Sequence, residues 1–164
     1  MKSTNTSMIV GLGLLVALAA GVFAMPARAT QTSEPQARKL EGTWRVQVTI
    51  RDCQSGAALR TFPAMLTFAQ GGTLTETTTG FPPALRSPGH GVWEKIGGHN
   101  YFAVSEAFLF NPANSWTGTQ RLSQIIEIGS EPDGFKSTAT NEIFDINGNL
   151  IVTGCATAVG DYLE

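Results

Sequence analysis

The sequence has 164 residues, of which 11 are lysine or arginine and 13 are aspartate or glutamate, so its formal net charge is −2. A mildly acidic chain without a basic run offers little attraction to the phosphates of DNA or RNA, and we exclude nucleic acid as a partner. The length suits one ordinary domain with a single core.

The N-terminal segment has the features of a secretory signal peptide. Lys2 precedes an apolar run over residues 8–23, and residues 27–29 supply the Ala-x-Ala pattern that signal peptidase cleaves. We therefore predict a signal peptide over residues 1–29 and a mature protein in the periplasm or secreted from a bacterial cell. A retained anchor is the alternative, although about 16 apolar residues are few for a span, and we expect no membrane span after cleavage.

The rest of the chain reads as one all-β domain. Residues 30–40 are polar and non-periodic, which predicts an N-terminal arm before a domain over 41–164. No amphipathic helix is indicated in that domain. Eight runs rich in Val, Ile, Thr and Phe are separated by Gly, Pro and Asn clusters, the pattern of short strands. These runs cover about residues 42–52, 64–70, 72–79, 91–96, 100–110, 118–128, 134–145 and 149–159.

The first run alternates between apolar and polar residues. Trp44, Val46, Val48 and Ile50 share one face, and polar side chains occupy the other. This period of two predicts a strand that is buried on one face only. The apolar face looks either into a packed core or into a cavity.

The connections between the eight runs alternate in length. They are long after the first, third and fifth runs, and the intervening turns are the short "QGG", "GGH" and "SEPDG". Successive turns of a meander lie at opposite ends, so three long loops should gather at one end. An even number of antiparallel strands lets the first and last strands pair. We therefore predict an eight-stranded antiparallel up-and-down barrel with no long helix, and two stacked sheets are the alternative.

Cys53 and Cys155 are the only cysteines. In an exported chain an even pair favours a disulfide over two free thiols. If the two residues face each other across the first and last strands, the register places Val46 opposite Tyr162. No Cys-x-x-Cys or His-x-x-His spacing occurs, so we expect neither a metal site nor a cofactor.

The triplet Gly42-Thr43-Trp44, at the start of the first strand, resembles the Gly-x-Trp signature of lipocalins and the wider calycin group. The resemblance implies that Trp44 plugs the closed end of the barrel and that the long loops surround an open mouth at the other end. It also implies that the lumen binds a ligand. Lipocalins usually add a helix and a basic residue after the eighth strand, whereas no Lys or Arg follows Lys136 here. The chain therefore resembles a short, helix-less, lipocalin-like or avidin-like barrel.

The fifth run, "YFAVSEAFLF", leaves two orientations open. One face carries Phe102, Val104, Glu106, Phe108 and Phe110, and the other carries Tyr101, Ala103, Ser105, Ala107 and Leu109. If the first face points inward, Glu106 is an interior carboxylate whose burial is costly without a partner. If the second face points inward, Glu106 is a solvated surface charge.

Three carboxylates on neighbouring strands suggest a site for chemistry. Together with a histidine on a mouth loop, the candidate catalytic residues are Glu76, Glu94, Glu106 and His90. General acid–base catalysis needs at least two such groups in one pocket. If the carboxylates point inward, they share the lumen with Gln124 and Asn141. The corresponding function is a barrel isomerase, cyclase or dehydratase.

The long loops and the fifth run supply the candidate ligand contacts. The ligand-binding candidates are Phe81, Arg86, His90, Phe102, Glu106 and Trp116. Apolar groups around a concavity are a common mark of a binding site, and we expect a small hydrophobic or amphipathic ligand. Alternatively, Phe81 and Trp116 fold down as lids that complete the core. A further alternative is a cell-envelope interaction module, which requires a packed lumen and a flat loop patch.

Overall fold

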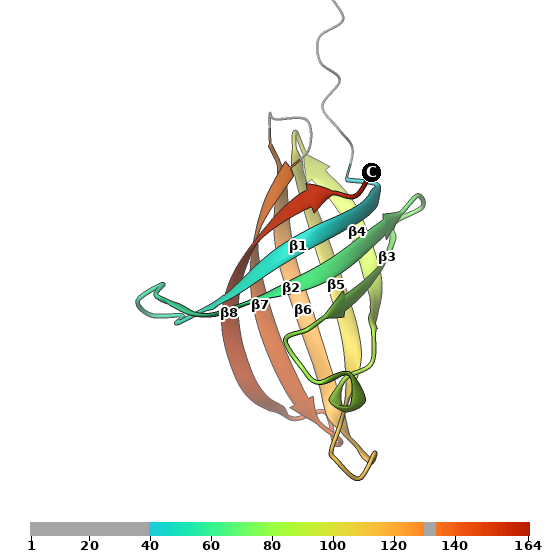
Figure 1. Ribbon diagram of the computed structural model, residues 1–164, viewed down its shortest axis with the longest axis vertical. Helices are drawn as coiled ribbons and strands as arrows, with labels where there is room; N and C mark the ends of the chain where they lie inside the picture. The colour runs from blue at the N-terminus through green and yellow to red at the C-terminus, as the bar shows by residue number, and fades with distance from the viewer. Residues whose placement is uncertain (1–39, 130–133) are drawn as a thin grey trace, which may run out of the picture. The chain divides into compact units, whose positions relative to one another are not determined.

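The computed structural model describes residues 40–129 and 134–164 (Figure 1). The predicted signal peptide, and the predicted arm up to residue 39, lie outside the described residues. The elements are β1 (Gly42–Arg51), β2 (Ala58–Ala69), β3 (Thr73–Thr78), the short 3-10 helix η1 (Pro83–Leu85), β4 (Gly89–Gly97), β5 (Asn100–Phe110), β6 (Trp116–Ile128), β7 (Gly134–Asp145) and β8 (Leu150–Tyr162). None of the helical residues in the described ranges forms a segment long and apolar enough to span a membrane.

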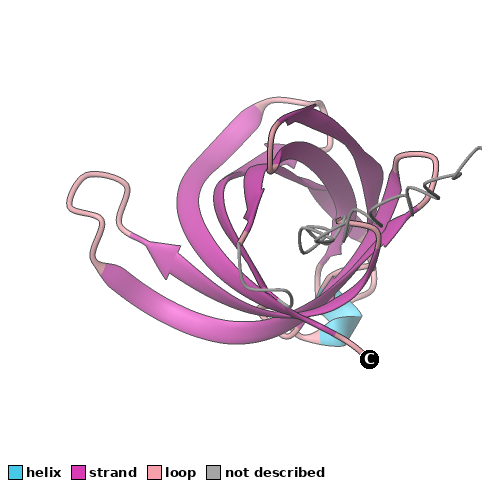
Figure 2. Cartoon of the chain, turned by 90° about the horizontal axis from the view of Figure 1, so that it is seen from above, coloured by secondary structure: helices cyan, strands magenta, loops and turns pink. Residues whose placement is uncertain are grey.

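The eight strands form a closed barrel. Each strand pairs antiparallel with the next, and β8 returns to pair antiparallel with β1. Figure 2 shows the resulting ring of strands. Closure leaves neither the first nor the last strand as an exposed edge, because each hydrogen-bonds to the other. The predicted all-β, eight-stranded up-and-down barrel is confirmed.

An aromatic floor, formed by Trp44, Phe68, Tyr101 and Phe135, fills one end of the barrel. Trp44 is fully buried, and its indole Nε1 donates a hydrogen bond of 2.9 Å to the Leu40 carbonyl. The rings of Phe135 and Tyr162 meet Trp44 edge-on, with centroids 5.0 and 5.2 Å away. Such edge-to-face pairs stabilise a core beyond the area they bury.

Local geometry explains the glycine of the Gly-x-Trp triplet. Gly42 adopts a φ of +124°, which other residues rarely tolerate. A Cβ at this position would also collide with the ring of Tyr162. The glycine therefore lets β8 end against the start of β1, beside Trp44.

The connection between β1 and β2 differs from the expectation. The sequence predicts a loop of about a dozen residues, whereas β2 begins at Ala58 and only residues 52–57 form the turn. Pro63 suggested a loop because proline cannot donate to a sheet ladder. In the structure Pro63 lies opposite Gln47 within the strand pair. The long first loop is thus a hairpin that projects from the barrel (Figures 1 and 2).

The disulfide between Cys53 and Cys155 is confirmed, with a Cα–Cα distance of 5.3 Å, but the expected register is wrong. Tyr162 lies opposite Trp44 rather than Val46, and Cys155 lies opposite Arg51. Cys53 follows the end of β1, in the turn. A disulfide between directly paired strand residues is geometrically demanding, and the turn gives Cys53 the freedom to reach β8.

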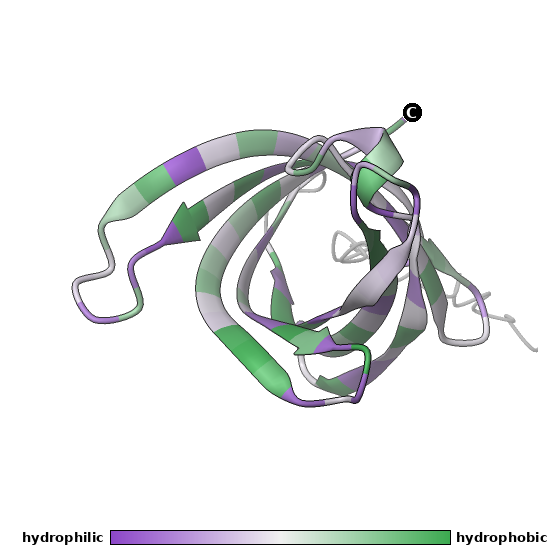
Figure 3. Ribbon diagram, turned by 90° about the horizontal axis from the view of Figure 1, so that it is seen from below, coloured by the Kyte–Doolittle hydropathy of each residue, from purple (hydrophilic) through white to green (hydrophobic). Residues whose placement is uncertain are grey.

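Inward and outward residues alternate along β5. The inward face is the one with small residues, because Tyr101, Ala103, Ser105, Ala107 and Leu109 are buried. The face that carries Glu106 points outward. Figure 3 shows the corresponding alternation of hydrophobic and hydrophilic residues along the strands. Of the two orientations that the sequence left open, the structure has the one with Glu106 on the surface.

Candidate functional site

The lumen contains a cavity of about 500 Å³. This volume falls within the range of small-molecule sites in proteins. The cavity is lined from all parts of the barrel except β4 and β5 and by the loop of residues 79–88. Its lining residues are Val46, Val48, Ile50, Arg60, Phe62, Ala64, Leu66, Glu76, Thr78, Gly80, Phe81, Pro82, Arg86, Gln120, Leu122, Gln124, Ser137, Ala139, Asn141, Ala156, Thr157 and Ala158.

Most of the wall is apolar. The alternation of β1 directs Val46, Val48 and Ile50 into the cavity, so its apolar face meets open space above the aromatic floor. On the neighbouring strand β8, which pairs with β1 and closes the barrel, Ala156 and Ala158 are too small to fill the lumen. The space is therefore left open in part because these short side chains lie beside the branched ones of β1.

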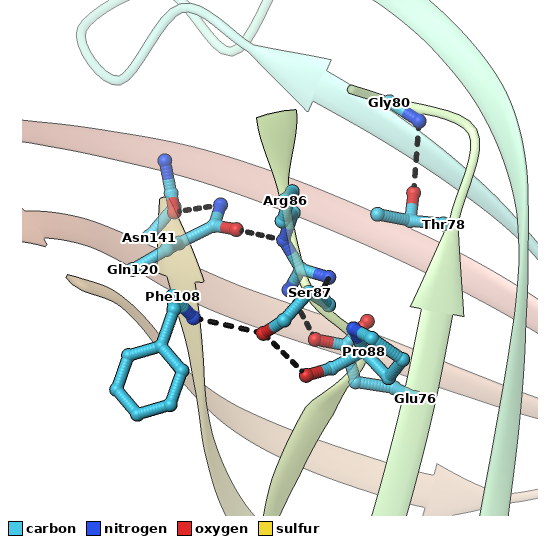
Figure 4. Close-up of polar contacts among 9 residues, drawn as sticks. All are labelled: Glu76, Thr78, Gly80, Arg86, Ser87, Pro88, Phe108, Gln120 and Asn141. Atoms are coloured by element: carbon cyan, nitrogen blue, oxygen red, sulfur yellow. Dashed lines mark hydrogen bonds and ion pairs between the residues drawn. The ribbon is translucent and has the colours of Figure 1, made fainter. Parts of the chain in front are cut away.

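Arg86 enters this apolar lumen from the loop of residues 79–88. The loop is fixed to β5, because Arg86 forms a β-bridge with Leu109 and the Ser87 amide donates to the Phe108 carbonyl at 3.0 Å. The Phe108 amide returns a hydrogen bond of 3.0 Å to the Ser87 hydroxyl. These contacts hold the Arg86 backbone at the barrel wall and turn its side chain inward (Figure 4).

A buried polar network surrounds the Arg86 guanidinium. Its Nη2 forms an ion pair with the Glu76 carboxylate, and its Nε donates to Gln120 Oε1 at 2.5 Å. Gln120 Nε2 in turn donates to Asn141 Oδ1 at 2.6 Å, which extends the network from β3 to β7 (Figure 4). Hydrogen bonds to charged groups are stronger than neutral ones, so this chain fixes Arg86 in place.

The ion pair is enclosed by the protein. The side chains of Arg86 and Glu76 are each only 4% exposed. A Cβ at Gly89, the residue of β4 opposite Glu76, would collide with the Glu76 carboxylate, so glycine makes room for it. Because each buried charge has its counter-ion, the network presents a polar but neutral patch to the cavity.

The structure does not bring the four candidate catalytic residues together. Glu76 lines the cavity, whereas His90, Glu94 and Glu106 are exposed on the outer face of the barrel. His90 lies opposite Glu106 in the β4–β5 ladder. Glu106 pairs with Arg121 at 2.7 Å, and both side chains are about half exposed. These three residues are placed outside because the strand alternation that buries Gly89 and Ser105 turns them outward.

The candidate ligand-binding residues divide in the same way. Phe81 and Arg86 line the cavity. Phe102 shares the outward face with Glu106 and His90 and does not line it. Trp116 is 48% exposed and is absent from the lining, and its indole donates a hydrogen bond of 2.7 Å to the Gly118 carbonyl. Phe81 and Trp116 therefore do not form a joint rim around the cavity.

Several lining residues were missed by the sequence analysis. Gln120 and Ser137 are polar residues on the inward faces of β6 and β7. Arg60 and Phe62 belong to the part of β2 that was taken as loop, and the Arg60 guanidinium lies 5.2 Å from the centre of the Phe62 ring. The spacing of Gln120 and Gln124 was the available signal, because residues four apart on a strand share a face.

Within the described ranges, no three His, Cys, Asp or Glu side chains gather in a way that would hold a metal ion. The chain matches no protein-family model and no curated protein sequence. The closed eight-stranded barrel is consistent with a calycin-like fold, and that fold is compatible with ligand binding.

Proposed function

We propose that this protein is an exported, lipocalin-like carrier that holds a small, partly apolar molecule in its lumen. The observation that supports the proposal is the cavity of about 500 Å³, which combines an apolar wall with one buried polar network. Binding sites for small molecules have this composition, since apolar walls supply affinity and a few polar groups fix orientation. A filled lumen would offer neither.

The disulfide bond is consistent with an exported protein. The disulfide between Cys53 and Cys155 closes a sequence separation of 102 residues, and such bonds persist in oxidising compartments. The signal peptide over residues 1–29 remains a prediction. In the proposal, the mature barrel works in the periplasm or outside the cell.

Native mass spectrometry of the protein purified from its own host tests the proposal. We expect a fraction of the protein to carry a non-covalent small molecule. Ala156→Phe should remove this adduct, because Ala156 faces the cavity and a phenyl group there occupies the ligand space. Val159→Phe is the matched control, since Val159 is 49% exposed on the outer face of the same strand. An adduct that persists unchanged in both variants would place the molecule outside the lumen.

An enzyme acting on the bound molecule is the second candidate. The observation that favours it is the meeting of Glu76 and Arg86 at one cavity, which supplies two ionisable groups within hydrogen-bond reach. The test is to incubate the retained molecule with wild-type protein and with the Glu76→Gln variant and to follow its mass and isomer composition. A change in the molecule that requires Glu76 would indicate catalysis. An unchanged molecule would support the carrier function and argue against the enzyme. The interaction module, in contrast, required a packed lumen, which the cavity does not provide.

A further inference from the structure

Two buried polar side chains in the cavity are not used by the Arg86 network. Ser137 is 6% exposed and Gln124 is 9% exposed, and both line the cavity. None of the described residues forms a hydrogen bond with the Ser137 hydroxyl. The Gln124 amide makes no hydrogen bond to another described residue and faces the open space of the cavity. A buried polar atom without a partner is costly, so the Ser137 hydroxyl calls for an explanation.

Their position is the deep end of the lumen. Ser137 lies opposite Ile126 in the β6–β7 ladder, and Ile126 is fully buried in the core. The next inward residue from Ser137 towards the closed end is Phe135, part of the aromatic floor. Gln124 is likewise one inward position from Ile126. Both polar groups therefore sit directly above the floor, where a bound molecule would place its inserted end.

The Arg86 network is the other polar group of the lumen, and Asn141, its member on β7, lies two residues beyond Ala139, the residue opposite Gln124. Gln120, its member on β6, is four residues from Gln124 along the same strand, a separation of about 13 Å. Between the two polar groups, the inward positions are Leu122 on β6 and Ala139 on β7. The lumen thus offers a neutral polar pair, Ser137 and Gln124, in addition to the charge-paired Arg86 network.

We propose that the inserted end of the ligand carries a neutral hydrogen-bonding oxygen, a hydroxyl or a carbonyl, which Ser137 and Gln124 bind above the aromatic floor. This inference rests on the proposed ligand-binding function. A hydroxyl and a carboxamide each donate and accept, so together they match either group. A charged end does not fit, because neither side chain carries a counter-charge and burying an unpaired ion is far more costly than burying a neutral group.

Competition against the fluorophore 1-aminoanthracene tests the assignment with three probes of one scaffold: naphthalene, 2-naphthol and 2-naphthoate. The readout is the affinity of 2-naphthol divided by that of naphthalene. We expect this ratio to fall about five- to tenfold in the Ser137→Ala, Gln124→Met double variant, the effect of losing one or two hydrogen bonds. Comparing this ratio between the wild-type protein and the double variant isolates the contribution of the hydrogen bonds. The free-energy cost of removing each probe from water is the same for both proteins and cancels. We expect 2-naphthoate to bind wild-type protein less tightly than 2-naphthol.

The structure provides a matched control in Ser105→Ala. The Ser105 hydroxyl is also buried, at 2% exposure, and has no hydrogen-bond partner among the described residues, but it does not line the cavity. We expect Ser105→Ala to leave the ratio unchanged. Neither serine variant should lose thermal stability without ligand, since each removes a polar group that makes no hydrogen bond with the described protein.

The outcomes separate the two proposals. If 1-aminoanthracene does not bind wild-type protein, or binds the Ala156→Phe variant equally well, the lumen is not a binding site and the proposed function fails. If all probes compete and the ratio is the same in wild-type and double-variant protein, the carrier stands and the assignment to Ser137 and Gln124 is wrong. A tighter complex with 2-naphthoate than with 2-naphthol would also overturn it.

Discussion

At the scale of single residues, Arg86 is the side chain on which the polar half of the cavity depends. It contacts Glu76 and Gln120 and, through Gln120, Asn141. A guanidinium has five donors in a fixed plane, so one residue can hold groups from different strands in a set geometry. This explains how a loop residue, rather than a strand residue, organises the polar part of the lumen.

We predict that Arg86→Met destabilises the protein by about 3–5 kcal/mol, because it leaves the Glu76 carboxylate buried without a counter-ion. Arg121→Met is the control and should cost less than about 1 kcal/mol, since its pair with Glu106 is half exposed. Urea unfolding measures both values. Equal losses in the two variants would mean that the Glu76–Arg86 pair is as well solvated as the surface pair.

Sequence alone could not fully anticipate these residues. Arg86 lies in a loop, where no periodicity indicates the direction of a side chain, and its inward turn depends on the pairing with Leu109 of β5. Glu76 was recognisable as a carboxylate that shares a strand face with Leu74 and Thr78. Its distinction from Glu94 and Glu106 required the inward face of each strand, which is set by the closed barrel and not by the local pattern.

At the scale of elements, the strands were predictable because alternation and turn residues mark them. The first half of β2 was not predicted as strand, since Pro63 argues against a strand interior. The inward face of β5 was undecidable because both faces are acceptable in isolation. In the closed barrel the face with the small residues Ala103 and Ser105 is buried inside. Glu106, on the outward face, accepts a hydrogen bond from Arg121.

The turn between β7 and β8 is held by Asp145, whose carboxylate accepts hydrogen bonds of 2.8 Å from the Asn147 and Asn149 amides. Hydrogen bonding, chiefly from the Asn149 side chain, lowers the pKa of Asp145 below its usual 3.8. A lowered folded-state pKa means that the stabilisation is present above 3.8 and is lost as the pH falls through the lower folded value.

We therefore predict that the backbone amide signals of Asn147 and Asn149 titrate with a midpoint below pH 3.8. An NMR pH titration measures this midpoint. Asp145→Asn should abolish the transition, because the amide does not titrate. A midpoint at or above 3.8 in the wild-type protein would show that the carboxylate gains nothing from the turn.

The disulfide acts on the seam where β1 meets β8. It connects residues separated by 102 positions, so it restricts most of the barrel sequence in the unfolded chain. We predict that Cys53→Ser combined with Cys155→Ser lowers the free energy of unfolding by about 5 kcal/mol, following the entropy of a loop of that length. Urea unfolding of the double variant measures the change. A loss below about 1 kcal/mol would mean that strand pairing alone already fixes the seam.

At the scale of the whole molecule, the barrel divides its lumen into two parts. Large aromatic side chains fill the closed end, beginning with Trp44, and small residues of β7 and β8 leave the remainder open. The two ends of β1 therefore belong to different parts of the lumen. Its Trp44 end belongs to the core, and its Val48 and Ile50 face the cavity.

Titration of the purified protein with 1-aminoanthracene tests this division most directly, because the fluorophore is neutral, apolar and of ligand size. The account predicts saturable binding of one molecule per wild-type protein, equal binding to Val159→Phe, and loss of binding in Ala156→Phe while its circular dichroism stays that of a barrel. Equal titration curves for wild-type and Ala156→Phe protein would contradict the claim that the lumen is an open, ligand-sized site.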